Sequence, residues 1–264
     1  MNANILTLSP IAIKLGPIAI HWYAIIIISG AVIGIWLAMR EAGKKGWDTE
    51  LILDYILVAF PLSLVGARLY YVAFEWSYYS SHLSEVFAIW NGGIAIYGAL
   101  ITAFLYLLFF CHYKKIKILE FLDIVAPAVL IGQSIGRWGN FVNQEAYGKV
   151  VENLDYLPEF IQNQMMINDS YRQPTFLFES IGTFLGFLLI ILFRHRLKFL
   201  KSGDIFAFYL IWYGIIRAVV EGMRTDSLML YNLRVSQWLS LILVIIGLIF
   251  LIINHGKKKT NFSI

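Results

Sequence analysis

The sequence predicts an all-α integral membrane protein with seven transmembrane helices. Of its 264 residues, 59% are hydrophobic and only 14% are charged, and the mean hydropathy of +0.70 is too high for a water-soluble domain of this size. Apolar runs long enough to cross a hydrocarbon core about 30 Å thick recur along the chain. The seven expected spans centre on Ile18 to Met39, Leu51 to Phe74, Ile94 to His112, Ile118 to Ile135, Thr175 to Phe193, Ile205 to Val220 and Gln237 to Ile253.

The distribution of basic residues predicts how the chain crosses the membrane. The spans divide the connecting segments into two sets, and most of the 21 Lys and Arg residues fall in one of them. By the positive-inside rule that set is cytoplasmic, so the N-terminus is expected outside and the C-terminus in the cytoplasm. Anionic membrane lipid then accounts for the net charge of +4, and no nucleic-acid partner is expected.

The organisation of the chain indicates a single polytopic membrane domain over residues 1–264. No linker or fixed-period repeat divides it, and residues 149–174 are expected to form a long external loop. The first span has no basic segment before it and no cleavage pattern after it, which indicates a retained helix rather than a signal peptide. Cys111 is the only cysteine, which excludes an intramolecular disulfide and a Cys-based metal cluster. No metal or other cofactor is expected.

Several charged residues are expected near the outer ends of the spans. Arg217, Glu221 and Arg224 fall at i, i+4 and i+7 of the sixth span, on one helix face. Such a group alone is compatible with a packing clamp. Arg68 and Arg137 are expected at the same depth, so the outer pocket would carry excess positive charge. A phosphate is the natural ligand, because guanidinium groups bind it bidentately.

The segment Gly136 to Gly148, GRWGNFVNQEAYG, gathers polar residues just past the expected outer end of the fourth span. Its glycines allow tight turns and close backbone approach. Asn140 and Asn143 supply amide donors and acceptors, and Glu145 can accept hydrogen bonds or orient an arginine. A capped turn at a helix end is the structural alternative, although a simple turn does not need this density of polar groups.

Five further residues complete the set of unusual polar residues. Tyr97 and Tyr23 lie about one turn into the third and first spans, where an aromatic belt is the ordinary explanation. A proline-led helix start brings Glu179 into the outer leaflet, where a buried carboxylate needs an arginine. Asp54 and Asp123 lie instead near inner ends of spans, and a structural partner or the inner interface is expected for both.

Together these motifs resemble a known family. GRWGNFVNQEAYG closely resembles the signature of bacterial phosphatidylglycerol–prolipoprotein diacylglyceryl transferases. HWYA near the start, the Gly-Gly pair before the third span, the PTFLFES segment and the YGIIRAVVEGMR series follow in that family's order along the whole chain. No GxSxG elbow, HExxH helix or P-loop is present, and no chain of Asp or Glu crosses the middle of the membrane. These absences favour chemistry on a lipid over transport.

The resemblance implies an enzyme that transfers the diacylglyceryl group of phosphatidylglycerol to the thiol of a lipobox cysteine in a prolipoprotein signal peptide, releasing glycerol phosphate. This is the first step of bacterial lipoprotein maturation. It implies a multi-pass protein of the bacterial cytoplasmic membrane with its active site toward the outer leaflet. The external loop over residues 149–174 is expected to contact the protein substrate.

The resemblance also indicates site residues. By position, Arg137 and Arg217 match arginines that the family needs for activity, and Tyr23 matches its important tyrosine in the first span. Its polar site is matched by Asn140, Glu145, Gly148, Glu221 and Arg224. The expected catalytic residues are Arg137, Arg217, Tyr97 and Glu221, and the expected substrate-binding residues are Tyr23, Arg68, Asn140, Asn143, Glu145, Gly148, Glu179 and Arg224.

One residue departs from the family pattern. Many relatives carry a histidine at the position of Tyr97, and that histidine has been proposed to activate the acceptor thiol. A phenol is a poor base at neutral pH, so Tyr97 either acts by hydrogen bonding or leaves the proton to another group. A cysteine thiol already supplies a few per cent thiolate, and a positive pocket raises that fraction.

Two alternatives stand beside the transferase. A transporter or receptor for an anionic metabolite or lipid would use the same arginines for binding alone, and turnover separates it from an enzyme. A scaffold for envelope assembly has no positive support in the sequence beyond membrane residence.

Overall fold

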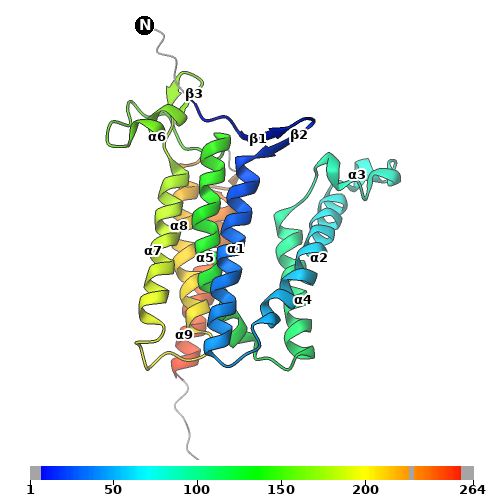
Figure 1. Cartoon of the computed structure of the whole chain (residues 1–264), viewed down its shortest axis with the longest axis vertical. Helices are drawn as coiled ribbons and strands as arrows, with labels where there is room; N and C mark the ends of the chain where they lie inside the picture. The colour runs from blue at the N-terminus through cyan, green and yellow to red at the C-terminus, as the bar shows by residue number, and fades with distance from the viewer. Residues whose placement is uncertain (1–6, 226–228, 257–264) are drawn as a thin grey trace, which may run out of the picture. The chain divides into compact units, whose positions relative to one another are not determined.

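The computed structural model describes residues 7–225 and 229–256, and seven of the helices in these ranges are long and apolar enough to span a membrane (Figure 1). This confirms the predicted all-α architecture, while the direction in which the chain crosses a membrane stays a prediction. The seven are α1 (Trp22–Lys44), α2 (Glu50–Phe74), α4 (Ile96–Tyr113), α5 (Ile118–Asn143), α7 (Thr175–Phe193), α8 (Asp204–Met223) and α9 (Val235–Gly256).

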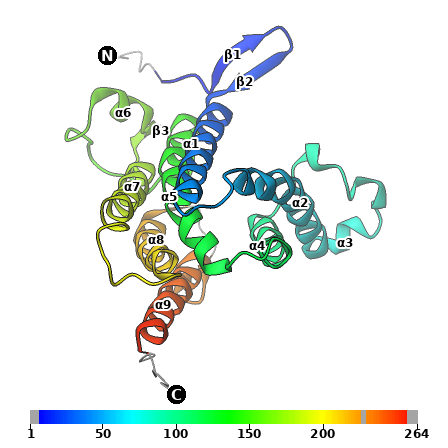
Figure 2. The same cartoon turned by 60° about the horizontal axis from the view of Figure 1, so that its bottom comes forward.

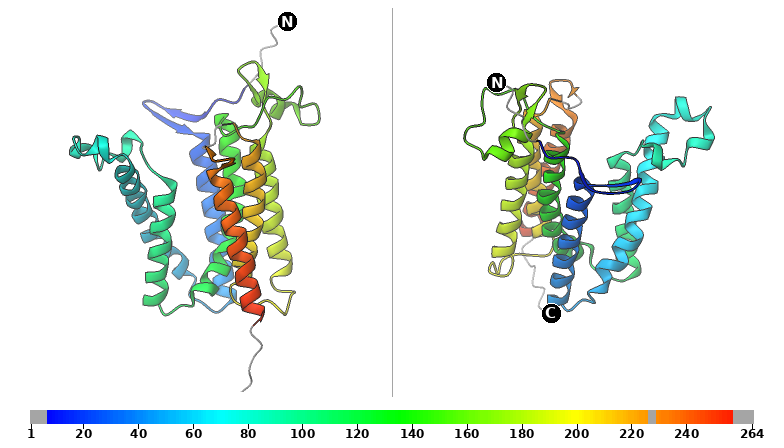
Figure 3. Two further views of the ribbon diagram at one scale, coloured as in Figure 1. Left: turned by 180° about the vertical axis from the view of Figure 1, so that it is seen from behind. Right: turned by 45° about the horizontal axis from the view of Figure 1, so that its top comes forward.

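Short elements connect these helices. Three antiparallel hairpins are formed by β1 (Ile11–Leu15) with β2 (Ile18–His21), β3 (Met166–Ile167) with β4 (Ser170–Tyr171), and β5 (Met229–Leu230) with β6 (Leu233–Arg234). The remaining elements of the described ranges are the helices α3 (Trp76–Tyr79) and α6 (Glu159–Gln164) and two 3₁₀ turns, Leu83–Glu85 and Ile89–Asn91. The three hairpins lie where α1, α7 and α9 begin, at one end of the helices (Figure 3).

The chain divides into two compact units, Met1–Leu37 with Leu122–Ile264 and Ala38–Phe121. In the first unit, α5 is the most buried of the spanning helices and lies between α1 and α7 (Figures 1 and 2). Helix α8 packs against both α7 and α9. In the second unit, α2 packs against α4.

Glycines set the closest helix contacts, as expected where small residues let backbones approach in a membrane. A Cβ atom added to Gly34 of α1 would lie 2.9 Å from the carbonyl oxygen of Ala128 in α5. One added to Gly247 of α9 would lie 2.9 Å from the carbonyl oxygen of Ala207 in α8. Real side chains do not approach this closely, so both positions require glycine.

The two acidic residues assigned to inner ends of spans have structural partners, as expected. The carboxylate of Asp123 in α5 accepts hydrogen bonds from the backbone N–H groups of Gly203 (2.6 Å) and Phe206 (2.9 Å). Asp123 thus satisfies donors in the first turn of α8 that have no partner within the helix. In the second unit, Lys114 donates to the carboxylate of Asp54 across 2.8 Å.

Two predicted boundaries were wrong. The first helix begins at Trp22 rather than Ile18, because the alternating residues Ile18–His21 pair with β1 across a turn at Gly16. Helix α5 continues to Asn143 instead of ending near Ile135, so most of the signature segment is helical rather than a turn past the span. Gly136 and Gly139 serve close packing within the helix instead of ending it, while Gly148 lies beyond the helix.

Candidate active site

A single buried carboxylate connects two arginines in the first unit. Glu179, in the second turn of α7, has a side chain that is only 2% exposed. One carboxylate oxygen accepts from Nη2 of Arg137 in α5 at 2.6 Å, and the other accepts from Nη1 of Arg217 in α8 at 3.1 Å. The expectation that Glu179 pairs with an arginine is confirmed, and the pairing joins three helices.

Arg217 lies between two carboxylates. Its Nη2 is 2.6 Å from a carboxylate oxygen of Glu221, one helical turn further along α8. The side chains of Arg217 and Glu221 are 15% and 4% exposed, so little solvent screens this pair. Arg217 is therefore fixed from two sides while retaining further donors on its guanidinium group.

A second chain of hydrogen bonds extends from Arg137 along the signature segment. Nη1 of Arg137 donates to the side-chain oxygen of Asn140 at 3.2 Å, and the amide nitrogen of Asn140 donates to Glu145 at 2.8 Å. Since a guanidinium group has five N–H donors, the bonds to Asn140 and Glu179 use two and leave three. Arg137 is 21% exposed and so is accessible to a ligand.

Glycines in the signature bring other predicted residues against this segment. A Cβ on Gly139 would lie 2.8 Å from the ring of Tyr23, so the tyrosine ring packs directly on α5. Gly148 pairs with Arg224 in an isolated β-bridge, and a Cβ there would lie 2.8 Å from Gln173. The segment after α5 is thereby held against the end of α8.

The region over residues 149–174 is anchored to the end of α5. The amide of Gln164, which is buried, donates to the carbonyl oxygens of Phe141 (3.2 Å) and Val142 (2.9 Å) at the end of α5. Gln144 donates in turn to the carbonyl oxygen of Gln164 at 2.7 Å. A cluster of buried apolar side chains joins this region to α5 and α7: Phe141, Val142, Leu154, Ile161, Met165 and Phe176.

The site has the chemistry of an anion-binding site built on fixed groups. Four arginines (Arg137, Arg217, Arg224 and Arg234) and three glutamates (Glu145, Glu179 and Glu221) meet there through the contacts described here and below. Glu179 and Glu221 orient the guanidinium groups of Arg137 and Arg217, and the four arginines exceed the three glutamates by one charge. Such preformed donors can bind a phosphate bidentately and stabilise charge that develops on it.

Comparison with known proteins assigns the family. Residues 10–253 match the model of prolipoprotein diacylglyceryl transferase. The phosphatidylglycerol–prolipoprotein diacylglyceryl transferase of Lactococcus lactis subsp. lactis (strain IL1403) is 60% identical over 254 residues, covering 96% of this chain and 97% of that protein. The protein of the same name from Streptococcus pyogenes serotype M1 is 59% identical over 255 residues, covering 97% and 98%. This chain belongs to the prolipoprotein diacylglyceryl transferase family.

The structure brings together most of the residues that the resemblance to prolipoprotein diacylglyceryl transferases indicated. Tyr23, Arg137, Asn140, Glu145, Gly148, Glu179, Arg217, Glu221 and Arg224 all lie in the first unit and are linked by the contacts above. Asn143 is exposed at the last residue of α5. The substrate-binding and catalytic roles of these residues remain predictions.

Two predicted site residues lie in the second unit. Arg68 of α2 is 3% exposed, and its guanidinium group donates to four backbone carbonyls, those of Glu85, Val86, Gly92 and Gly93, at 2.7 to 2.8 Å. These bonds hold the segment between α3 and α4 against α2. Tyr97, the second residue of α4, is 37% exposed. That Arg68 and Tyr97 take part in the same site as Arg137 stays a prediction.

Sequence reasoning missed Arg234 as a site residue. Its Nη1 and Nη2 donate to the carbonyl oxygens of Glu221 and Arg224, both at 2.5 Å. Its own backbone N–H donates to Gln237, whose amide donates to the carbonyl oxygen of Ala218 at 3.2 Å. Arg234 therefore caps the C-terminal end of α8, where Glu221 and Arg224 lie, with donors from the start of α9.

Arg234→Gln should lower kcat by about tenfold to a hundredfold, because hydrogen bonds from a charged donor contribute roughly 1.5 to 3 kcal/mol. The substitution releases the end of α8 without removing a group that pairs with Glu179. Arg234→Lys should recover part of the rate, since an ammonium group keeps the charge without the planar fork. The measurement is release of glycerol phosphate by purified protein of unchanged helix content.

The exposed Lys115 of the second unit supplies the control, and Lys115→Gln should leave the rate unchanged. Wild-type kcat in Arg234→Gln would show that the cap does not position the site.

Proposed function

We propose that this protein transfers the diacylglyceryl group of phosphatidylglycerol to the thiol of a cysteine in a prolipoprotein, a step of lipoprotein maturation. Relatives that are 59–60% identical along nearly the whole chain carry the name of this activity. The observation that carries the proposal is the buried bridge of Glu179 between Arg137 and Arg217. It holds two guanidinium groups ready for an anionic lipid in a chain whose helices can span a membrane.

The reaction is a substitution at carbon. The cysteine thiol loses its proton, which ends in the solvent or on the departing phosphate monoester, and the thiolate attacks the carbon of the diacylglyceryl group that carries the phosphate ester. A thioether C–S bond forms while the C–O bond to the phosphate breaks, and the electron pair of that bond leaves with the oxygen. The products are a thioether-linked diacylglyceryl cysteine and glycerol phosphate.

The arginines act on the leaving group. Phosphatidylglycerol is a phosphodiester with one negative charge, and the departing phosphate monoester carries about 1.5 to 2 negative charges at neutral pH. Negative charge on the phosphate therefore increases along the reaction. Fixed guanidinium groups bind the more charged transition state more strongly than the ground state, which is the condition for catalysis.

The neighbouring residues position these groups. Glu221 and Glu179 fix Arg217 from two sides, and Asn140 with Glu145 fixes Arg137. The ring of Tyr23 packs on Gly139 and so lies against this segment of α5. We assign catalytic roles to Arg137, Arg217 and Glu221, and binding roles to the residues around them.

The proposed setting is the bacterial cytoplasmic membrane, with the site toward the outer leaflet. The distribution of basic residues in the connecting segments supports this setting, because the positive-inside rule predicts that the arginine end of the helices is outside. Residues 149–174, anchored by Gln164 beside the signature, would contact the lipobox region of the acceptor signal peptide.

Turnover tests this function directly. Full-length protein is incubated with labelled phosphatidylglycerol and a lipobox peptide, and glycerol phosphate and thioether product are measured. Equal amounts of both products support the transferase. Binding of the lipid without either product would leave the transporter or receptor for an anionic lipid.

Arg217→Lys should reduce kcat by about a hundredfold, near the lower range for losing one donor to a developing oxyanion. Lysine keeps the charge but cannot contact two oxygens in one plane. The rate is measured in the same turnover assay, with Arg196→Lys, an exposed position outside the site, as the matched control. Near-wild-type turnover of Arg217→Lys would show that this position needs only a positive charge and not a bidentate contact with the phosphate.

Tyr97→Phe tests whether the phenol takes part in the reaction. If the hydroxyl group orients the thiolate or the phosphate by a hydrogen bond, its loss should lower kcat by about tenfold to a hundredfold. Tyr97→His should then be tolerated, because imidazole can donate the same bond. An unchanged rate and pH profile in Tyr97→Phe would assign this residue to packing at the membrane interface.

A further inference from the structure

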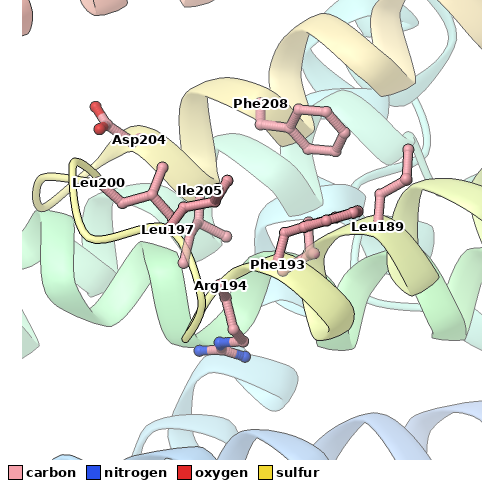
Figure 4. A pocket seen from close by; sticks show the side chains of 9 residues that line it. Leu189, Phe193, Arg194, Leu197, Leu200, Asp204, Ile205 and Phe208 are labelled. Atoms are coloured by element: carbon pink, nitrogen blue, oxygen red, sulfur yellow. The ribbon is translucent and has the colours of Figure 1, made fainter.

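An apolar groove lies between the end of α7 and the start of α8, at the far end of α7 from Glu179. Its volume is about 210 Å³. Phe193 and Phe208 come from the two helices, and Leu197 and Leu200 come from the connection between them (Figure 4). Phe193 is fourteen residues beyond Glu179, or about 21 Å along the helix at 1.5 Å per residue. The groove is therefore separate from the arginine site.

The polar residues of the groove lie at its edge. Figure 4 shows the carboxylate of Asp204 and the guanidinium group of Arg194 pointing away from the apolar side chains. The carboxylate of Asp204 is bound by His255 at 2.7 Å and Asn254 at 2.8 Å, and by the backbone N–H of Lys201 at 2.7 Å. The negative charge of Asp204 is therefore bound by residues of α9 and by the backbone, and does not face the groove. The interior of the groove offers hydrocarbon contacts alone.

The connection between α7 and α8 is strongly basic. It contains Arg194, Arg196, Lys198 and Lys201, and Asp204 is the acidic residue that follows. Lys201 donates to the carbonyl oxygen of Asn254 at 2.6 Å. Arg196 and Lys198 are exposed on either side of Leu197, which lines the groove. An apolar groove and exposed cations thus occur together at the end of two spanning helices.

We propose that this groove binds an acyl chain of an anionic phospholipid, whose phosphate is bound by Arg196 and Lys198. The volume lies below the roughly 300 to 1,000 Å³ of sites that enclose a whole small molecule, so it suits part of one chain. Charge complementarity selects an anionic lipid over a zwitterionic one. The proposal rests on the spanning helices and is independent of the transferase activity.

Photolabelling of full-length protein in phosphatidylcholine nanodiscs tests the proposal. The probe is phosphatidic acid with a diazirine at the end of one acyl chain, compared with phosphatidylcholine that carries the same chain. After illumination, mass spectrometry should locate the phosphatidic acid label on residues 189–208 in clear excess over the phosphatidylcholine label. In the doubly substituted Arg196→Gln/Lys198→Gln protein, the ratio of phosphatidic acid label to phosphatidylcholine label should fall by about five- to twenty-five-fold, since each basic residue contributes to anionic lipid binding.

Two further variants complete the experiment, a control double substitution and a substitution that fills the groove. Lys115→Gln/Lys117→Gln removes two charges from another connection and should keep the labelling unchanged. Ile205→Trp fills the groove and should remove labelling of residues 189–208 by both lipids. Equal labelling by the two lipids, or a preference that survives Arg196→Gln/Lys198→Gln, would overturn the proposal in favour of ordinary surrounding lipid. Absence of label together with crosslinks between two protein copies at this groove would overturn it in favour of a dimer interface.

Each result is independent of turnover, because phosphatidic acid lacks the glycerol phosphate leaving group. Equal labelling of the wild-type protein by the two lipids, together with normal transfer activity, would contradict this inference alone. Selective labelling of a wild-type protein without transfer activity would contradict the proposed function alone.

Discussion

The carboxylate of Glu179 is the group on which the candidate site depends. It is almost fully buried and binds one arginine from α5 and one from α8. Burying a charge in an apolar region is strongly unfavourable unless it is paired, and removing one member of such a group leaves the others uncompensated. The bridge therefore fixes three helices relative to one another and fixes the two guanidinium groups at the same time. The same ion-pair bridge therefore stabilises the packing of the helices and orients the arginines of the candidate site.

Contacts at both ends of α8 stabilise the position of its arginine and glutamate side chains. Arg234 caps the last turn of α8, and Asp123 satisfies donors in its first turn. Helix α8 is thus held at both ends, with Arg217 and Glu221 in its final turns. Because the guanidinium groups are oriented before a lipid arrives, less free energy is lost in arranging them when the phosphate binds. A fixed site of this kind suits a reaction in which charge grows on the leaving group.

The sequence predicts the spans and the pairing of Glu179 well, because both follow from burial. Long apolar runs have few alternatives, and a carboxylate among them needs a cation. The extension of α5 to Asn143 was missed because glycines fit both a turn and a close helix contact. The role of Arg234 was missed because bonds from a side chain to distant backbone carbonyls leave no spacing pattern. Arg68, predicted to bind substrate, shows the same difficulty, since four backbone carbonyls surround its guanidinium group.

The kinetics of Glu179→Gln test the central claim most directly. The amide keeps the shape of the side chain and removes its negative charge, so the site becomes more positive while the arginines lose their common acceptor. If the bridge positions them for the leaving phosphate, kcat should fall by about a hundredfold or more while KM for phosphatidylglycerol stays the same or decreases. Unchanged or increased kcat in folded Glu179→Gln protein would contradict this account, because positive charge alone would then be sufficient.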